Sequence, residues 1–327
     1  MNLKPIPETE DLSSRSARPK RRRRRLRTIA MLPTMLTLGN LYFGFLAMYY
    51  CGREMHDLGA GVSAAAVLTL KSQRWEALAP TYLSIASVML VAAMICDALD
   101  GRVARLTDRT SKFGEQMDSL ADVVSFGAAP ALMMVTLVRR ELFEWGYAPF
   151  GFERFGQAAV LIGAVFVCCT ALRLARFSVE ATVEEAAHSG FCGLPSPGGA
   201  GAVISLVFLH DHLDAPGVWV AGADCITTVL PICTLLAALL MVSRVPYAHA
   251  VSALLRRRPF GHAVTVLLVV PLLLLYTQQS LAVLAWGFVV SGPIRMLWRR
   301  RRVAAVPPQP VVDSPSQTLP SKDRQAQ

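Results

Sequence analysis

Eight apolar segments, each close to the length of a bilayer-crossing helix, dominate the chain between residues 30 and 297. A transmembrane helix needs about 20 mostly apolar residues. Within lipid, every backbone N–H and C=O group must be paired inside the protein, which helices achieve on their own. We therefore predict an all-α, polytopic membrane helical bundle. The expected spans are residues 30–50, 79–99, 122–138, 157–176, 194–210, 225–243, 261–277 and 280–297.

Composition supports a membrane protein and excludes two other classes. The chain is 53% hydrophobic and 17% charged, with a mean hydropathy of +0.42. A soluble domain carries about 25% charged residues. A disordered basic tail protein has far fewer apolar residues than this chain. Neither an ordinary soluble domain nor a disordered nucleic-acid-binding protein fits.

The formal net charge of +10 comes from the two ends of the chain. The basic runs Lys20–Arg25 and Arg299–Arg302 flank expected spans, and no aromatic residue interleaves with their arginines. Attraction to anionic membrane lipids therefore explains these runs better than nucleic-acid binding does. We divide the chain into a basic tail (1–29), a core (30–243), additional transmembrane helices (244–298) and a polybasic, disordered tail (299–327).

The distribution of Lys and Arg also predicts sidedness. With eight spans, 27 of the 33 Lys and Arg residues fall on the side of the two termini. Because cytoplasmic loops are enriched in Lys and Arg, this side is expected to face the cytoplasm. A count of six spans instead of eight would also place both termini on the same side of the membrane. The other side is expected to carry loops that contain Arg53, Lys71, Arg74, Arg139, Arg140 and Arg154.

Four aspartates flank the connection between the second and third expected spans. Asp97 and Asp100 are three residues apart, and Asp118 and Asp122 are four residues apart. On helices, each pair lies on one face, about one turn apart. If the two helices pack together, four carboxylates converge at the cytoplasmic rim. All-oxygen ligands favour Mg²⁺, Mn²⁺ or Ca²⁺, and two such ions about 3.5–4 Å apart form a clamp for displacement at phosphorus.

These residues belong to a longer pattern, D-x-x-D-G-x-x-A-R-x8-G-x-x-x-D-x-x-x-D, which resembles the signature of the CDP-alcohol phosphatidyltransferases. Short segments between about Leu32 and Ser243, including the GLPSP block at Gly193–Pro197, show a weaker similarity to the serine-using branch of that family. The pattern is matched at all eight of its specified positions: Asp97, Asp100, Gly101, Ala104, Arg105, Gly114, Asp118 and Asp122.

The resemblance implies transfer of a phosphatidyl group from CDP-diacylglycerol to L-serine, with release of CMP. It implies two Mg²⁺ or Mn²⁺ ions held by the four aspartates, and Asp122 as the general base. It also implies a homodimer in the cytoplasmic membrane, with the active site facing the cytoplasm. The residues implied for the CDP moiety are Gly101, Ala104, Arg105 and Gly114, with Thr37 and Asn40 from the first span.

Weaker candidates lie in the fourth and fifth spans. Arg173 and Arg176 share a helix face at the cytoplasmic rim, where they could reach lipid phosphates or bind the serine carboxylate. Ser196 lies in the GLPSP block, whose prolines could also simply mark a helix start.

A second polar group, containing His210, Asp211, His212 and Asp214, has the composition of a metal site. The topology places it on the side opposite the four aspartates. We therefore expect these residues in a solvated loop.

Two alternatives to serine transfer remain. Another acceptor, either glycerol 3-phosphate or an inositol compound, would leave the signature unchanged. A metal-ion transporter would need carboxylates near the bilayer midplane, whereas these aspartates are confined to one connection at the rim.

Overall fold

The computed structural model describes this chain as a bundle of helices. The described part of the chain contains helices and no β-strand. This agrees with the all-α class predicted from the apolar segments. The described residues are 20–59, 81–107, 112–145, 151–183, 193–214, 218–245, 247 and 277–304.

Seven of the eight expected spans coincide with helices, and the span expected at 261–277 lies outside the described residues except for residue 277. The elements are α1 (Lys20–Gly59), α4 (Tyr82–Thr107), α5 (Lys112–Asp122), the π-helix η2 (Val123–Ala128), α6 (Ala129–Trp145), α7 (Phe152–Val183), α8 (Ser196–Leu213), α9 (Val220–Val242) and α12 (Thr277–Ala304).

Five stretches in the described part are long and apolar enough to cross a membrane. The polytopic helical class is thereby confirmed, while the count of eight spans stays a prediction. The five stretches are Tyr82–Val103, Phe113–Phe143, Glu153–Arg176, Val220–Val242 and Gln278–Trp298.

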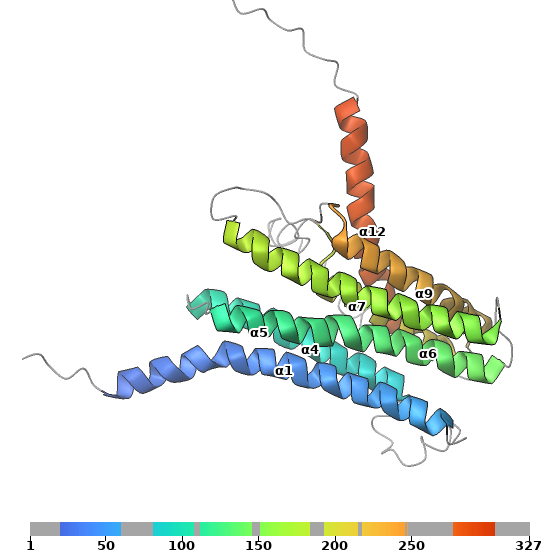
Figure 1. Cartoon of the computed structure of the whole chain (residues 1–327), viewed down its shortest axis with the longest axis horizontal. Coiled ribbons are helices and arrows are strands. Elements are labelled where there is room, and N and C mark those ends of the chain that lie inside the picture. The colour runs from blue at the N-terminus through green and yellow to red at the C-terminus, as the bar shows by residue number, and fades with distance from the viewer. Residues whose placement is uncertain are drawn as a thin grey trace, which may run out of the picture.

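The helices lie side by side, apart from α12, which runs steeply away from the bundle (Figure 1). Helix α1 packs along α4, and α7 and α8 both pack against α9. Helices α5, η2 and α6 follow one another as a continuous rod between these two groups (Figure 1). This rod contacts both α1 and α7, so its aspartates lie within reach of residues from both sides.

The rod contains a turn of π-helix directly after the acidic signature. The Ala129 N–H donates to the carbonyl oxygen of Val124, five residues earlier, which widens the helix at this point. Such π-bulges occur often at functional sites. Small residues allow close packing there, because a Cβ on Gly44 of α1 would lie 2.9 Å from Ser125 Cα and a Cβ on Gly127 would lie 3.3 Å from Thr170.

The expectation that His210 and Asp211 lie in a solvated loop is wrong. Helix α8 extends to Leu213 and buries both residues, with exposed fractions of 0% and 6%. The loop expected around Arg140 is also wrong, because Arg140 is buried inside α6. The sequence-based topology treated each charge as solvated, whereas these charges are buried against one another.

Candidate active site

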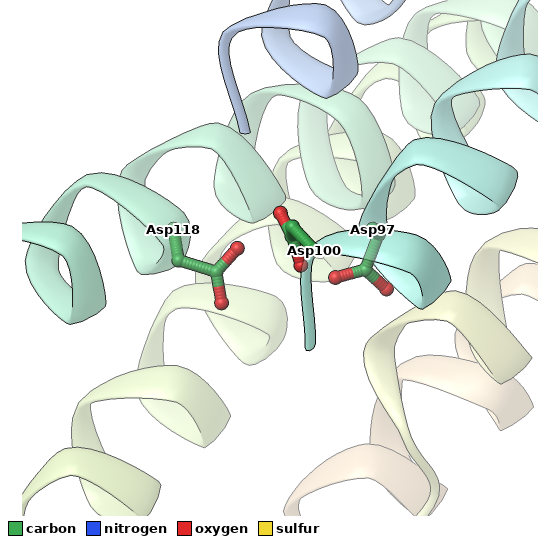
Figure 2. A group of neighbouring side chains, drawn as sticks. All are labelled: Asp97, Asp100 and Asp118. Atoms are coloured by element: carbon green, nitrogen blue, oxygen red, sulfur yellow. The ribbon is translucent and has the colours of Figure 1, made fainter. Parts of the chain in front are cut away.

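Three aspartates of the acidic signature meet between α4 and α5. One carboxylate oxygen from each of Asp97, Asp100 and Asp118 lies within 4.8 Å of the others. Figure 2 shows the three side chains with Asp100 between Asp97 and Asp118. The convergence expected from the three- and four-residue spacings is therefore present for these three residues.

Helix α1 supplies two polar side chains to the same place. The Thr37 hydroxyl lies 3.1 Å from Asp100 Oδ2 and 3.1 Å from the carbonyl oxygen of Pro33. Asn40 donates from Nδ2 to Asp122 Oδ1 over 3.1 Å. Since both side chains are buried, each hydrogen bond holds its aspartate in a defined orientation.

Two buried oxygen atoms in this site have no hydrogen-bond partner among the described residues. They are Asp118 Oδ1 and Asn40 Oδ1. An unpaired buried acceptor costs about 1–3 kcal/mol. Divalent cations bind to carboxylate and amide oxygens, so a bound ion would satisfy such acceptors and offset the repulsion between the carboxylates. The acidic cluster thus fits a metal ion of the Mg²⁺ class.

Asp122 is placed differently from the other three aspartates. It lies one helical turn beyond Asp118, is 7% exposed, and is absent from the group whose oxygens converge within 4.8 Å. Its hydrogen-bond partner is the Asn40 side chain, and the backbone carbonyl oxygen of Asn40 accepts a hydrogen bond of 3.0 Å from Ser125 Oγ. Asp122 therefore lies beside the three-carboxylate group, close enough for the charges of Asp97 and Asp118 to act on it, and is held against α1.

Helices α7 and α8 contribute a cation and a hydroxyl. Arg173 donates from a terminal guanidinium nitrogen to Ser196 Oγ over 2.5 Å. The charge of Arg173 acts on both Asp97 and Asp122, which makes it the positive neighbour of the carboxylates. Arg176, three residues later, is exposed. The structure thus brings Arg173 and Ser196 together at the site.

The remaining residues of the signature lie around the connection between α4 and α5. Gly101 is exposed, and a Cβ placed on it would meet nothing within 4 Å, which leaves open space beside Asp100. Gly114 lies in α5 and is partly buried. Ala104 and Arg105 lie in the last turns of α4, and their side chains fall outside the described part of the chain.

Sequence reasoning missed a second buried polar cluster, around Arg140 in α6. Arg140 is 3% exposed and contacts acidic side chains of three helices. The sequence contained an indication of this cluster, because burying a charged residue next to an apolar span costs free energy and such residues are usually functional or paired with an opposite charge. Ser125 was also missed, since no residue pattern identifies a π-turn.

Comparison with known proteins gives a consistent result. The family model described as CDP-alcohol phosphatidyltransferase matches residues 30–230. That range contains every residue of the acidic signature together with Thr37, Asn40, Arg173 and Ser196.

Individual relatives carry one common name, CDP-diacylglycerol–serine O-phosphatidyltransferase. The Helicobacter pylori (strain J99) protein is 42% identical over 123 residues, covering 38% of this chain and 46% of the relative. The Mycobacterium tuberculosis (strain H37Rv) protein is 39% identical over 140 residues, covering 42% and 44%. The Saccharomyces cerevisiae protein is 36% identical over 134 residues, covering 39% and 43%. The chain thus spans about half the length of the curated relatives it matches.

Proposed function

The chain belongs to the CDP-alcohol phosphatidyltransferase family, and on that premise we propose that it transfers the phosphatidyl group of CDP-diacylglycerol to L-serine. The serine hydroxyl oxygen forms a bond to the phosphorus that carries diacylglycerol. The bond from this phosphorus to the oxygen bridging it to CMP breaks. Phosphatidylserine and CMP are the products, and the hydroxyl proton passes to a base.

The observation that carries the proposal is the meeting of Asp97 and Asp100 of α4 with Asp118 of α5. Hydrolytic sites built on Ser-His-Asp need no such group of carboxylates, whereas displacement at a pyrophosphate needs its negative charge neutralised. The family match supports CDP-activated substrates. Serine as the acceptor is supported by the names of the relatives.

The cofactor in this proposal is Mg²⁺ or Mn²⁺, as two ions. Asp97, Asp100 and Asp118 would hold them, with Asp122 as a further ligand. The all-oxygen donor set supports these ions over zinc, and Asp118 Oδ1, which has no hydrogen-bond partner among the described residues, is available as a ligand atom. When bound, the metal supplies positive charge that stabilises the pyrophosphate and CMP as leaving group.

Asp122 is the proposed general base toward the serine hydroxyl. It is buried, and the hydrogen bond from Asn40 Nδ2 occupies only one of its carboxylate oxygens. The other oxygen is left to accept the hydroxyl proton. Asn40 acts here as a positioning residue, since it orients Asp122 without contacting the reacting atoms.

Arg173 and Ser196 are proposed to bind the serine carboxylate or the lipid phosphate. Guanidinium groups recognise both anions through paired hydrogen bonds, and the 2.5 Å contact already orients Arg173. Arg176 is proposed to assist from the exposed side of the same helix. The CDP moiety is assigned to Gly101, Ala104, Arg105 and Gly114, with Thr37 and Asn40 from α1.

We place the enzyme in the cytoplasmic membrane, with both termini and the aspartates facing the cytoplasm. The excess of Lys and Arg on that side supports this orientation. The basic runs at residues 20–25 and 299–302 are assigned to anionic lipids rather than to nucleic acid. A homodimer is proposed from the family resemblance alone.

An acceptor panel tests the reaction. Purified protein is incubated with CDP-diacylglycerol, Mg²⁺ or Mn²⁺, and either L-serine, glycerol 3-phosphate or an inositol compound, while CMP release is followed. We expect CMP release to depend on L-serine. Release with another acceptor alone would refute the serine assignment, and no release with any acceptor would refute phosphatidyl transfer.

A further inference from the structure

A cluster of buried charged side chains lies far from the aspartates of the active site. We call Glu54, Arg140, Glu141, His210 and Asp211 the Arg140 cluster; all five are at most 6% exposed. Along α1, Glu54 follows Asn40 by 14 residues, and along α5–α6 Arg140 follows Asp122 by 18 residues. At 1.5 Å per residue these separations are about 20–27 Å, so the cluster lies toward the other end of the bundle.

Arg140 is the centre of this cluster. Its Nε donates to Glu141 Oε1 over 3.0 Å, and its terminal nitrogens lie 3.5 Å from Glu54 Oε1 and 3.3 Å from Asp211 Oδ1. Asp214, whose side chain is 41% exposed, lies 3.9 Å away and connects the cluster to the surface. One buried cation therefore faces three buried carboxyl groups from α1, α6 and α8.

Asp211 accepts two short hydrogen bonds from hydroxyl groups besides its contact with Arg140. Its Oδ2 accepts from Thr81 Oγ1 over 2.5 Å and from Ser84 Oγ over 2.6 Å, while Oδ1 faces Arg140. Hydrogen bonds of this kind stabilise the ionised form of a carboxyl group. Asp211 is thus held as a carboxylate.

His210 lies beside Arg140 and two of the three carboxyl groups. Its Nδ1 is 3.4 Å from a terminal nitrogen of Arg140 and 3.8 Å from Asp211 Oδ1. Its Nε2 is fully buried, has no hydrogen-bond partner among the described residues, and lies 3.6 Å from Glu141 Oε1.

The buried charges then fail to balance if all three carboxyl groups are ionised. Arg140 would leave two negative charges uncompensated at a site shielded from water, which is strongly unfavourable. Asp211 accepts from two hydroxyl groups and Glu141 Oε1 lies 3.0 Å from Arg140 Nε, and these contacts favour the ionised form of both carboxyl groups. Glu54 makes the longest of the three carboxyl contacts to Arg140, at 3.5 Å.

We propose that Glu54 is a proton-binding site, and that the folded protein carries a proton on this residue to balance the Arg140 cluster. Burial raises the pKa of Glu54, Arg140 counteracts this, and the charge of Asp211 adds to the rise. Glu54 lies four residues beyond the span expected at 30–50. The site is separate from the proposed phosphatidyl transfer.

The other ionisable groups that face Glu54 among the described residues come from α1, α6 and α8. On α1, Arg53 and His56 both interact with Asp57 nearer the surface. On the same helix, burial raises the pKa of the Cys51 thiol to about 12 and the charge of Glu54 adds to this, so the thiol stays neutral. The ionisable groups from the other helices are Arg140 and Glu141 of α6 and His210, Asp211 and Asp214 at the end of α8, while α4 provides a backbone hydrogen bond from Tyr82 that lowers the pKa of Glu54.

Infrared difference spectroscopy of the full chain in lipid nanodiscs tests the proton directly. A protonated carboxylic acid has a C=O stretching band that a carboxylate lacks. We expect the spectrum of wild type minus Glu54→Gln at neutral pH to show this band. The matched control, Glu153→Gln, changes an exposed glutamate of α7 and should leave the band in place. Absence of the band from the Glu54→Gln difference, or its loss in Glu141→Gln instead, would overturn the proposal.

Thermal unfolding across pH provides a second readout that does not depend on activity. Because the pKa of Glu54 is raised in the folded state, the stability it contributes at low pH is lost as pH rises through that pKa. Between the pKa of an unfolded glutamate, about 4.3, and the raised pKa of folded Glu54, the wild-type apparent melting temperature should fall by about 2–4 °C per pH unit, and this contribution should level off at higher pH. Glu54→Gln mimics the protonated acid and should not show this loss. A Glu54→Gln protein that melts below wild type at every pH would mean that Glu54 is ionised, and would overturn the proposal.

Discussion

Replacing Gly44 by alanine should disturb the carboxylate site through packing alone. A Cβ at residue 44 would lie 2.3 Å from Ser125 Oγ and 2.9 Å from Ser125 Cα. The hydroxyl can rotate away, but the Cα belongs to the π-turn of the rod and cannot. To restore an ordinary carbon–carbon contact of about 3.5 Å, α1 must retreat by about 0.6 Å.

That retreat acts on the hydrogen bond between Asn40 and Asp122. Asn40 lies one helical turn before Gly44 on α1, and its Nδ2 is 3.1 Å from Asp122 Oδ1. An increase of about 0.6 Å would take this contact beyond hydrogen-bond range. Overpacking of this kind costs about 1–3 kcal/mol, and a shift of about 1 Å near a reacting group can lower the rate on the order of 100-fold.

The assay is CMP release at saturating CDP-diacylglycerol and L-serine, together with a thermal unfolding curve. We expect kcat of Gly44→Ala to fall by about 10–100-fold. Gly52→Ala is the matched control, because it makes the same change in the same helix at a position where a Cβ meets nothing within 4 Å. Equal kcat values for the two variants would refute the proposed dependence of Asp122 on the position of α1.

Two further substitutions test Asp122 as the base and Gly193, which lies just before the start of α8. Asp122→Asn should abolish CMP release while leaving the melting temperature within a few degrees of wild type; retained turnover would remove Asp122 from the role of base. Gly193→Ala should destabilise the protein by about 2 kcal/mol or more, because a side chain is strained at such a backbone conformation. Gly193 has φ +93°, and its Cβ would lie 2.5 Å from the Met241 carbonyl oxygen. An unchanged unfolding curve would contradict this.

The fold class and the core of the site could be predicted from the sequence because both depend on local spacing. Apolar segments of bilayer length give helices, since lipid leaves the backbone no other partner. The spacings between Asp97 and Asp100, and between Asp118 and Asp122, place each pair on one helix face. The meeting of Asp97, Asp100 and Asp118 then required only that α4 and α5 pack together.

The parts that sequence reasoning missed depend on contacts between distant segments. His210 and Asp211 look like loop residues because each is polar, and only the packing of α1, α6 and α8 provides their partner, Arg140. The π-turn after Asp122 lies where the rod packs closely against Gly44 and Thr170, and the periodicity of the sequence indicates neither the turn nor this packing. Tertiary pairing of buried charges can therefore reverse an assignment based on polarity.

The most direct test of the central claim is incorporation of labelled L-serine into lipid by protein first stripped of divalent metal with a chelator. We predict labelled phosphatidylserine only when CDP-diacylglycerol and either Mg²⁺ or Mn²⁺ are both restored, and none with Asp100→Asn under the same conditions. Labelled lipid formed without divalent metal, or at the wild-type rate by Asp100→Asn, would contradict a metal-dependent phosphatidyl transfer at the three-aspartate site.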